Sequence, residues 1–153
     1  MSKKPNIIMI LTDDLGYGDL SCLNPRSQIH TANIDRLASE GMHLTDCHSS
    51  SALCTPSRYA LLTGRYNWRS RLKCLVLPGH SSHLIEEGRE TMATLLKKNG
   101  YQTAAVGKWH LGMDWQTKNG YQLPLDFMDK NAAADNLMEN IDFTAPVKNG
   151  PIE

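Results

Sequence analysis

The most informative stretch of the sequence is Cys54-Thr55-Pro56-Ser57-Arg58, which continues as Tyr59-Ala60-Leu61-Leu62-Thr63-Gly64-Arg65. It predicts a helix over residues 56–63, because Pro56 suits a first helical turn and Gly64 suits a C-terminal cap. Cys54 would then lie just before the helix, where unpaired N–H groups and the positive end of the helix dipole favour an anion. Arg58, four residues on, comes round to the same face. The stretch therefore predicts a thiol, an anion-binding helix end and a guanidinium close together.

Taken whole, residues 54–65 resemble the sulfatase signature. In sulfatases a maturation enzyme reads the core Cys-x-Pro-x-Arg and oxidises its cysteine to Cα-formylglycine, an aldehyde that is hydrated in the resting enzyme. A buried structural cysteine before an ordinary helix is the simpler interpretation of an isolated Cys-x-Pro, but it does not explain a match of this length. The resemblance therefore implies that Cys54 is converted by a formylglycine-generating maturation enzyme.

Two further blocks resemble the same family. Asp13 and Asp14 follow an apolar run, and their hard oxygen donors suit Ca²⁺ or Mg²⁺, although turn chemistry explains an isolated Asp pair equally well. The second block is Gly107-Lys108-Trp109-His110-Leu111-Gly112. Lys108 and His110 are two residues apart, so in extended backbone both would face the same way and could reach one anion. Taken alone, this pair is more simply a solvated lysine and a satisfied histidine.

The resemblance to sulfatases implies a mechanism for sulfate ester hydrolysis. One hydroxyl of the hydrated aldehyde attacks sulfur and forms a covalent sulfo-enzyme intermediate, and the second hydroxyl then loses its proton as sulfate is expelled. Arg58 would hold the hydrate, Lys108 would pair with the sulfate group, and His110 would assist the second step. The implied catalytic residues are thus Cys54, Arg58, Lys108 and His110, and the implied ligands of a Ca²⁺ (or Mg²⁺) ion are Asp13, Asp14 and the modified Cys54.

The remaining pattern predicts an α/β fold. Short apolar runs over residues 6–12, 42–48 and 101–106 are typical of strands, and residues 31–41 and 90–99 are typical of amphipathic helices. In the second of these helices Met92, Leu95 and Leu96 are expected to face inward. Alternation of strands and helices favours a mostly parallel sheet flanked by helices, and the resemblance implies an alkaline-phosphatase-like architecture. Residues 66–88 are predicted to form an irregular excursion on the substrate side.

The chain is predicted to be the N-terminal part of a sulfatase catalytic domain. Residues 1–112 would form the motif-bearing α/β core, and residues 113–153 a loop-rich, truncated tail in which the periodic pattern fades. The later metal ligands of the family, its leaving-group acid and a second sulfate-binding lysine find no match, and Asp135-Asn136 comes too early to be assigned. We therefore expect these 153 residues alone to bind metal poorly and to turn over slowly or not at all.

The composition of the chain limits the classes of partner and of metal site that we expect. Lys plus Arg and Asp plus Glu number 16 each, so a formal net charge of zero argues against nucleic acid as a partner. The longest strongly apolar run, residues 7–11, is too short to span a bilayer. No signal peptide is visible, although the family is often periplasmic, secreted or lysosomal, so the compartment stays open. The four cysteines form no Cys-x-x-Cys pair, so we expect no structural zinc site, and we expect free, mostly buried thiols at Cys22, Cys47 and Cys74.

Two alternatives to a sulfatase remain at this point. A phosphonate or phosphodiester hydrolase of the same superfamily would share the formylglycine and the Asp pair, and paired kinetics on sulfate and phosphate esters would separate the two. A non-catalytic truncated remnant would only fold or bind. The identity of the sulfate ester, whether aryl or carbohydrate, does not follow from these residues.

Overall fold

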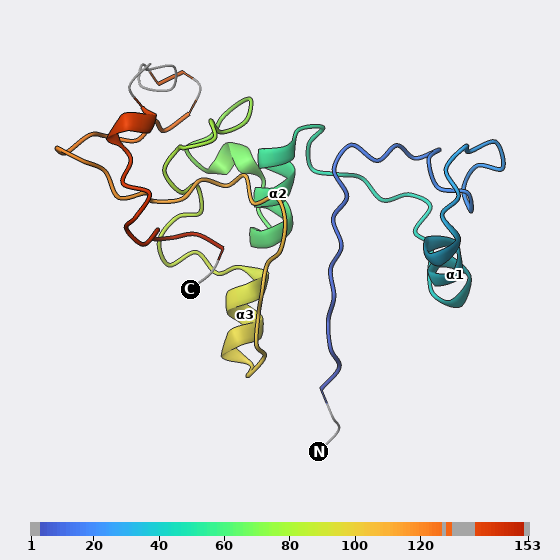
Figure 1. The fold of residues 1–153 in the computed structure, drawn as a ribbon. Coiled ribbons are helices and arrows are strands. Elements are labelled where there is room, and N and C mark those ends of the chain that lie inside the picture. Colours follow the sequence, from blue (N-terminus) through green and yellow to red (C-terminus); the bar gives the residue numbers. More distant parts are fainter. Residues whose placement is uncertain (1–3, 127, 130–136, 152–153) are drawn as a thin grey trace. The chain divides into compact units, whose positions relative to one another are not determined.

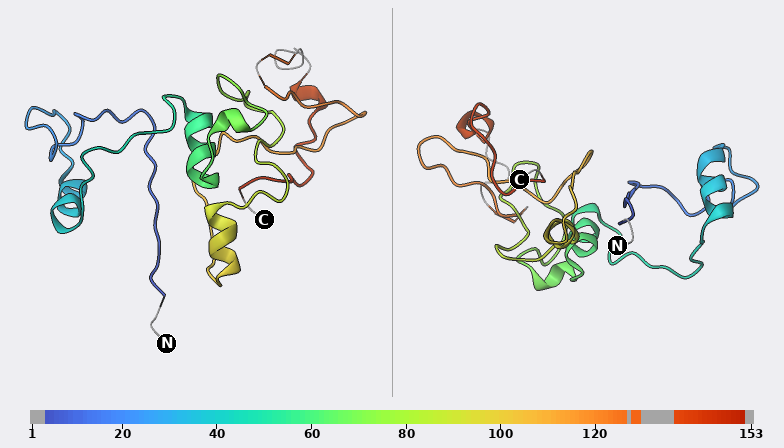
Figure 2. Two further views of the ribbon diagram at one scale, coloured as in Figure 1. Left: turned by 180° about the vertical axis from the view of Figure 1, so that it is seen from behind. Right: turned by 90° about the horizontal axis from the view of Figure 1, so that it is seen from below.

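The structure is a computed structural model of residues 1–153, and it describes residues 4–126, 128–129 and 137–151. The chain divides into two compact units, Met1–His48 and Ser49–Glu153. The order of helices is α1 (Ala32–Glu40), α2 (Cys54–Thr63), the 3₁₀ turn η1 (Asn67–Arg69), α3 (Met92–Lys98) and the 3₁₀ turn η2 (Met138–Asn140). Figures 1 and 2 show α1 in the first unit and the other elements in the second.

The three helices confirm the helices predicted from the sequence, with shifted ends. Thr31 precedes α1 and Gly41 follows it, as expected, but Gly41 is not left-handed. Helix α2 begins at Cys54, two residues before the predicted start, and ends at Thr63, capped by Gly64 with a φ of 64°. Helix α3 is shorter than predicted and begins with a capping box between Thr91 and Thr94. Capping chemistry thus marks the end of α2 and the start of α3.

The predicted parallel sheet is not formed within the described residues. Two isolated antiparallel bridges are present, Asp114 with Lys148 and Thr117 with Ile141. Residues 6–12, 42–48 and 101–106 were expected to be strands, yet Ile8 and Val106 are 85% and 102% exposed. The reason is physical: an apolar run fits a pleated surface, but a strand exists only where a second strand pairs with it. Residues 4–12 run as an extended trace in Figure 1.

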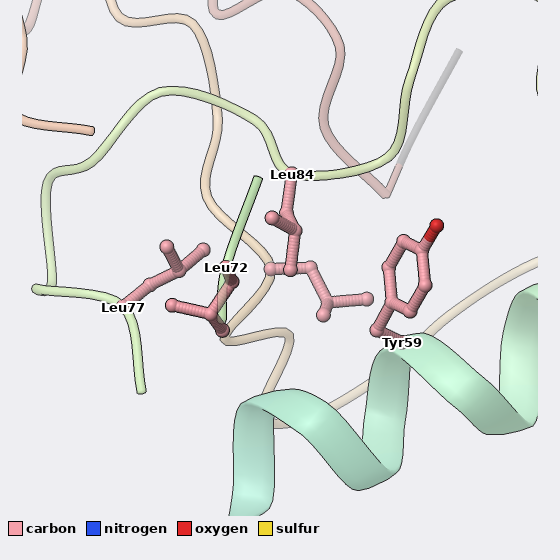
Figure 3. Close-up of a cluster of buried hydrophobic side chains, with 5 residues drawn as sticks. Tyr59, Leu72, Leu77 and Leu84 are labelled. Atoms are coloured by element: carbon pink, nitrogen blue, oxygen red, sulfur yellow. The ribbon is translucent and has the colours of Figure 1, made fainter. Parts of the chain in front are cut away.

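The core of the second unit comes from α2 and from irregular chain. Tyr59 on α2 packs with Leu72, Leu77, Leu84 and Leu111, each at most 2% exposed. Figure 3 shows the side chains of the first four pointing toward one another beside the helix. The excursion over residues 66–88 is irregular, as predicted, but it supplies three of these five core residues. It therefore holds α2 in place.

The other apolar stripes are less buried than predicted. Helix α3 contacts α2 but buries none of its residues, and Leu95, expected to face inward, is 48% exposed. In the first unit α1 also buries no residue, and its apolar side lines an open groove of about 320 Å³. No helix in the described part of the chain has the length and apolarity to cross a membrane. The four cysteines are free thiols, but Cys22, Cys47 and Cys74 are exposed, so the expectation that they are mostly buried was wrong.

Candidate functional site

Cys54 is the first residue of α2 and lies half-buried at its N-terminus. The helix is preceded by Leu53 in extended backbone, and its first intrahelical hydrogen bond runs from Ser57 N to the Leu53 carbonyl over 3.2 Å. The peptide N–H groups of Cys54 and Thr55 therefore lie ahead of the helical ladder, and Pro56 has no N–H to satisfy. This corrects the predicted position just outside the helix, but it keeps the thiol at the positive end of the helix dipole.

The first turns of α2 are hydrogen-bonded to the block that contains Lys108 and His110. Arg58 donates from Nη1 to the carbonyl of Lys108 over 2.6 Å. Thr55 donates from Oγ1 to the carbonyl of His110 over 3.0 Å. These two bonds join residues 50 and 55 positions apart in the sequence. The structure thus brings Cys54, Arg58, Lys108 and His110 into one neighbourhood of the second unit.

The backbone around His110 differs from the extended geometry that the spacing suggested. His110 has a φ of 54°, in the left-handed region that few non-glycine residues adopt. Its Nε2 lies 2.9 Å from the carbonyl of Leu77, while Lys108 stays exposed. A shared direction for the two side chains therefore no longer follows from their spacing. The ring of His110 is instead held against the irregular chain that also carries the core.

Asp13 and Asp14 lie in the first unit, whereas the other candidate residues lie in the second. Both carboxylates are on an exposed loop, and Asp14 has a φ of 59°. A bond from Gly16 N to the Asp19 carboxylate closes the following turn over 2.7 Å. Within the described part of either unit, no three His, Cys, Asp or Glu side chains gather as a metal site requires. Asp135 and Asn136 lie outside the described residues.

A cluster of charged groups lies beside α2. Tyr59 donates to both carboxylate oxygens of Glu86 over 2.8 and 3.1 Å, and Arg65 pairs with the same carboxylate over 3.1 Å. Burial raises the pKa of Glu86, but hydrogen bonds from its backbone and from Tyr59, with the charges of Arg65 and Arg89, lower that pKa overall. Burial and the Glu86 contact raise the pKa of the Tyr59 hydroxyl. This cluster ties α2 to the end of the excursion.

Thr55 belongs to the site although its position in the sequence did not identify it. It is fully buried although polar, and its hydroxyl also accepts a hydrogen bond from Leu77 N over 3.3 Å. The available signal was a hydroxyl residue at the second position of a helix, directly after the proposed nucleophile. A hydroxyl there has to find partners when it is buried, because an unpaired buried donor is costly.

Comparison with known proteins matches residues 5–150 to the family model described as Sulfatase. The chain belongs to the sulfatase family. It is 50% identical over 112 residues to an N-acetylgalactosamine-6-O-sulfatase of Bacteroides thetaiotaomicron, covering 73% of this chain and 22% of that one. It is 46% identical over 125 residues to the steryl-sulfatase of Homo sapiens, with 78% of this chain and 21% of that one covered. The chain therefore spans about a fifth of the length of these curated relatives.

A solved structure supports the same family. It comes from work on glycosaminoglycan metabolism by Bacteroides thetaiotaomicron and superposes with a TM-score of 0.69 at 48% identity. The match covers 78% of this chain and 24% of that chain. The likeness agrees with the alkaline-phosphatase-like architecture that the sequence implied. It leaves the parallel sheet unconfirmed, because the described residues of this sulfatase chain contain no strand.

Proposed function

We propose that this chain carries the nucleophile end of a sulfatase site that hydrolyses an aryl or carbohydrate sulfate ester. The observation that carries the proposal is the pair of hydrogen bonds from α2 to residues 108 and 110. They bring the Cys-x-Pro-x-Arg motif and the Lys-x-His motif together, although some fifty residues separate them. Sulfatase names among the relatives favour this reading over a phosphonate or phosphodiester hydrolase.

The electrostatics suit a sulfate group. Sulfate esters are anionic, and negative charge grows on the leaving oxygen, so fixed positive groups should stabilise the transition state. Cys54 offers the N–H groups of a helix start, Arg58 a guanidinium one turn on, and Lys108 an exposed ammonium. The Arg58 guanidinium donates from Nη1 to the Lys108 carbonyl, and this bond orients its plane.

Formylglycine at position 54 would supply, when hydrated, a hydroxyl that attacks sulfur. The residues around that position then have separate tasks. Arg58 holds the group at position 54, Lys108 binds sulfate oxygens, and His110 takes a proton at a ring nitrogen. The half-buried position of Cys54 keeps the reacting atoms partly away from water.

A divalent cation fits the chemistry of the Asp13–Asp14 pair, whose carboxylate oxygens are the hard donors that Ca²⁺ and Mg²⁺ prefer. We propose these two residues, with position 54, as its ligands. Such an ion would neutralise charge on the sulfate oxygens when bound. Two carboxylates and one further group fall short of the six to eight oxygens that Ca²⁺ takes. We therefore propose that the cation binds tightly only with further ligands.

The modification of Cys54 tests the proposal directly. The chain is co-expressed with a formylglycine-generating enzyme, and the peptide spanning position 54 is analysed by mass spectrometry. We expect aldehyde at position 54 and intact thiol at Cys74, an exposed cysteine outside the motif. Cys74→Ala is the matched control and should leave conversion unchanged. Thiol in every molecule would remove the proposed nucleophile.

Substrate class is tested with the converted chain. Binding of an aryl sulfate and of the matching aryl phosphate is compared by NMR titration, with signals of Arg58 and Lys108 as reporters. We expect the sulfate to shift both signals more strongly, and Lys108→Met to weaken that binding. A preference for the phosphate would favour the hydrolase alternative.

A further inference from the structure

We propose that Thr55 is a positioning residue that holds His110 with its Nδ1 available as the proton acceptor. The inference deepens the proposed function, because it rests on the role of His110 at that site. It concerns the residue between the cysteine and the proline of the motif. Three hydrogen bonds between Thr55, Leu77 and His110 form a closed ring.

The three bonds join α2, the excursion and the Lys-x-His block. Leu77 N donates to Thr55 Oγ1 over 3.3 Å, and Thr55 Oγ1 donates to the His110 carbonyl over 3.0 Å. The ring of His110 returns to the Leu77 carbonyl through Nε2 over 2.9 Å. Thr55 is 0% exposed and Leu77 is 1% exposed, so water does not compete for these groups. Each bond depends on the placement given by the other two.

The chemistry of the third bond fixes the tautomer of His110. A carbonyl oxygen only accepts, so Nε2 must carry the hydrogen. In the neutral ring the lone pair then resides on Nδ1. Nδ1 is buried and has no hydrogen-bond partner among the described residues. The nitrogen able to take a proton is thus the one that the protein leaves unpaired.

The backbone of His110 shows why the three hydrogen bonds, together called the clasp, are required. His110 has a φ of 54°, a conformation that a non-glycine residue keeps only when its surroundings hold it there. The Thr55 hydroxyl donates a hydrogen bond to the carbonyl of that same residue. Thr55 directly follows Cys54 in the first turn of α2, so this hydrogen bond joins the helix start that carries the proposed nucleophile to the residue proposed as its base. Thr55 itself does not touch the reacting atoms.

The experiment reads the tautomer rather than turnover. The 153-residue chain is labelled with ¹⁵N-histidine, and long-range ¹H–¹⁵N correlation spectra are recorded with the ring in its neutral form. We expect the Nε2–H form of His110 to exceed the Nδ1–H form by about tenfold, the factor that corresponds to one net hydrogen bond. Thr55→Val should reduce this ratio toward that of free imidazole, and Thr55→Ser should retain it.

Thr63→Val is the matched control, because it removes a hydroxyl of the same helix that bonds to Tyr59 outside the clasp. It should leave the tautomer ratio of His110 unchanged. A lower ratio in Thr55→Val alone is then not a general effect of lost stability. A folded Thr55→Val chain with an unchanged ratio overturns the proposal. If Thr55→Val does not fold, an Nδ1–H tautomer in the wild type or a lost ratio in Thr55→Ser overturns it equally. Failure of Cys54 conversion would refute the proposed function without moving this ratio.

Discussion

The structure leaves no room for a side chain at Gly112, and we predict that Gly112→Ala strongly lowers the free energy of unfolding. A Cβ atom built at Gly112 would lie 2.0 Å from the Ser82 carbonyl oxygen and 2.7 Å from its carbon. Both are backbone atoms, so they cannot rotate away. The φ of Gly112 is +71°, which adds about 1–2 kcal/mol for any L side chain. Overpacking against fixed backbone adds about 1–3 kcal/mol, so we expect a total loss of about 2–5 kcal/mol.

Gly120→Ala separates the two terms of that sum. Gly120 has a φ of +70°, nearly that of Gly112, but a Cβ there meets nothing within 4 Å. It should therefore cost only the conformational term of about 1–2 kcal/mol. The difference between the two variants measures the clash with Ser82 alone.

Urea unfolding followed by tryptophan fluorescence provides the assay. The three tryptophans, Trp68, Trp109 and Trp115, all lie in the second unit, so the signal reports that unit. With a slope of about 1–2 kcal/mol per molar urea, the midpoint of Gly112→Ala should fall about 1 M below that of Gly120→Ala. Equal midpoints for the two variants would refute the close approach of residue 112 to Ser82, and with it the local geometry of the site.

Three further predictions concern charge and metal. Tyr59→Phe removes both bonds to Glu86 and should cost about 1.5–3 kcal/mol of unfolding free energy in the same urea assay; a loss below about 0.5 kcal/mol would contradict the bond to a charged group. Folding lowers the pKa of Glu86 and of Asp114, so their stabilisation is complete above the ordinary carboxyl pKa of about 4 and is lost as the pH falls through the lowered values. Thermal melts should therefore decline below about pH 4, less steeply in Glu86→Gln, and a decline that begins near neutral pH would contradict this assignment. Calcium titration of the chain by calorimetry should give a Kd no tighter than about 10⁻⁴ M, lost in Asp13→Asn, whereas submicromolar affinity would show a complete site.

Local chemistry explains what the sequence predicts well. The end of α2 follows from Gly64, whose left-handed backbone donates its N–H to the Ala60 carbonyl over 2.8 Å. The predicted start of α3 was two residues early, and the hydroxyl of Thr91, which accepts from Thr94 N, sets the observed start. Both signals act within four residues, so neighbouring sequence contains all the information they need.

Pairing and packing are the parts that the sequence could not predict. The apolar run over residues 7–11 resembles a strand, yet its residues are 46–85% exposed, because no partner strand pairs with it in the described chain. The core leucines Leu72, Leu77 and Leu84 stand in a stretch without periodicity, so no pattern identified them. Their burial depends on α2 and on Leu111, which are distant in sequence. Only tertiary contacts decide such positions.

The site shows the same division on a smaller scale. The two-residue spacing predicted that Lys108 and His110 lie on one side of an extended segment. His110 instead has left-handed backbone, so the segment is not extended there. Residue 112 must be glycine because its backbone passes close to the Ser82 carbonyl. Two hydrogen bonds flank this approach: Leu84 N donates to the Leu111 carbonyl over 2.8 Å, and Met113 N donates to the Ser81 carbonyl over 3.1 Å. Gly112 therefore does more than end the Lys-x-His block. The left-handed backbone at His110 accompanies the contact of its Nε2 with the Leu77 carbonyl, so the two-residue spacing could suggest the residues but not their orientation.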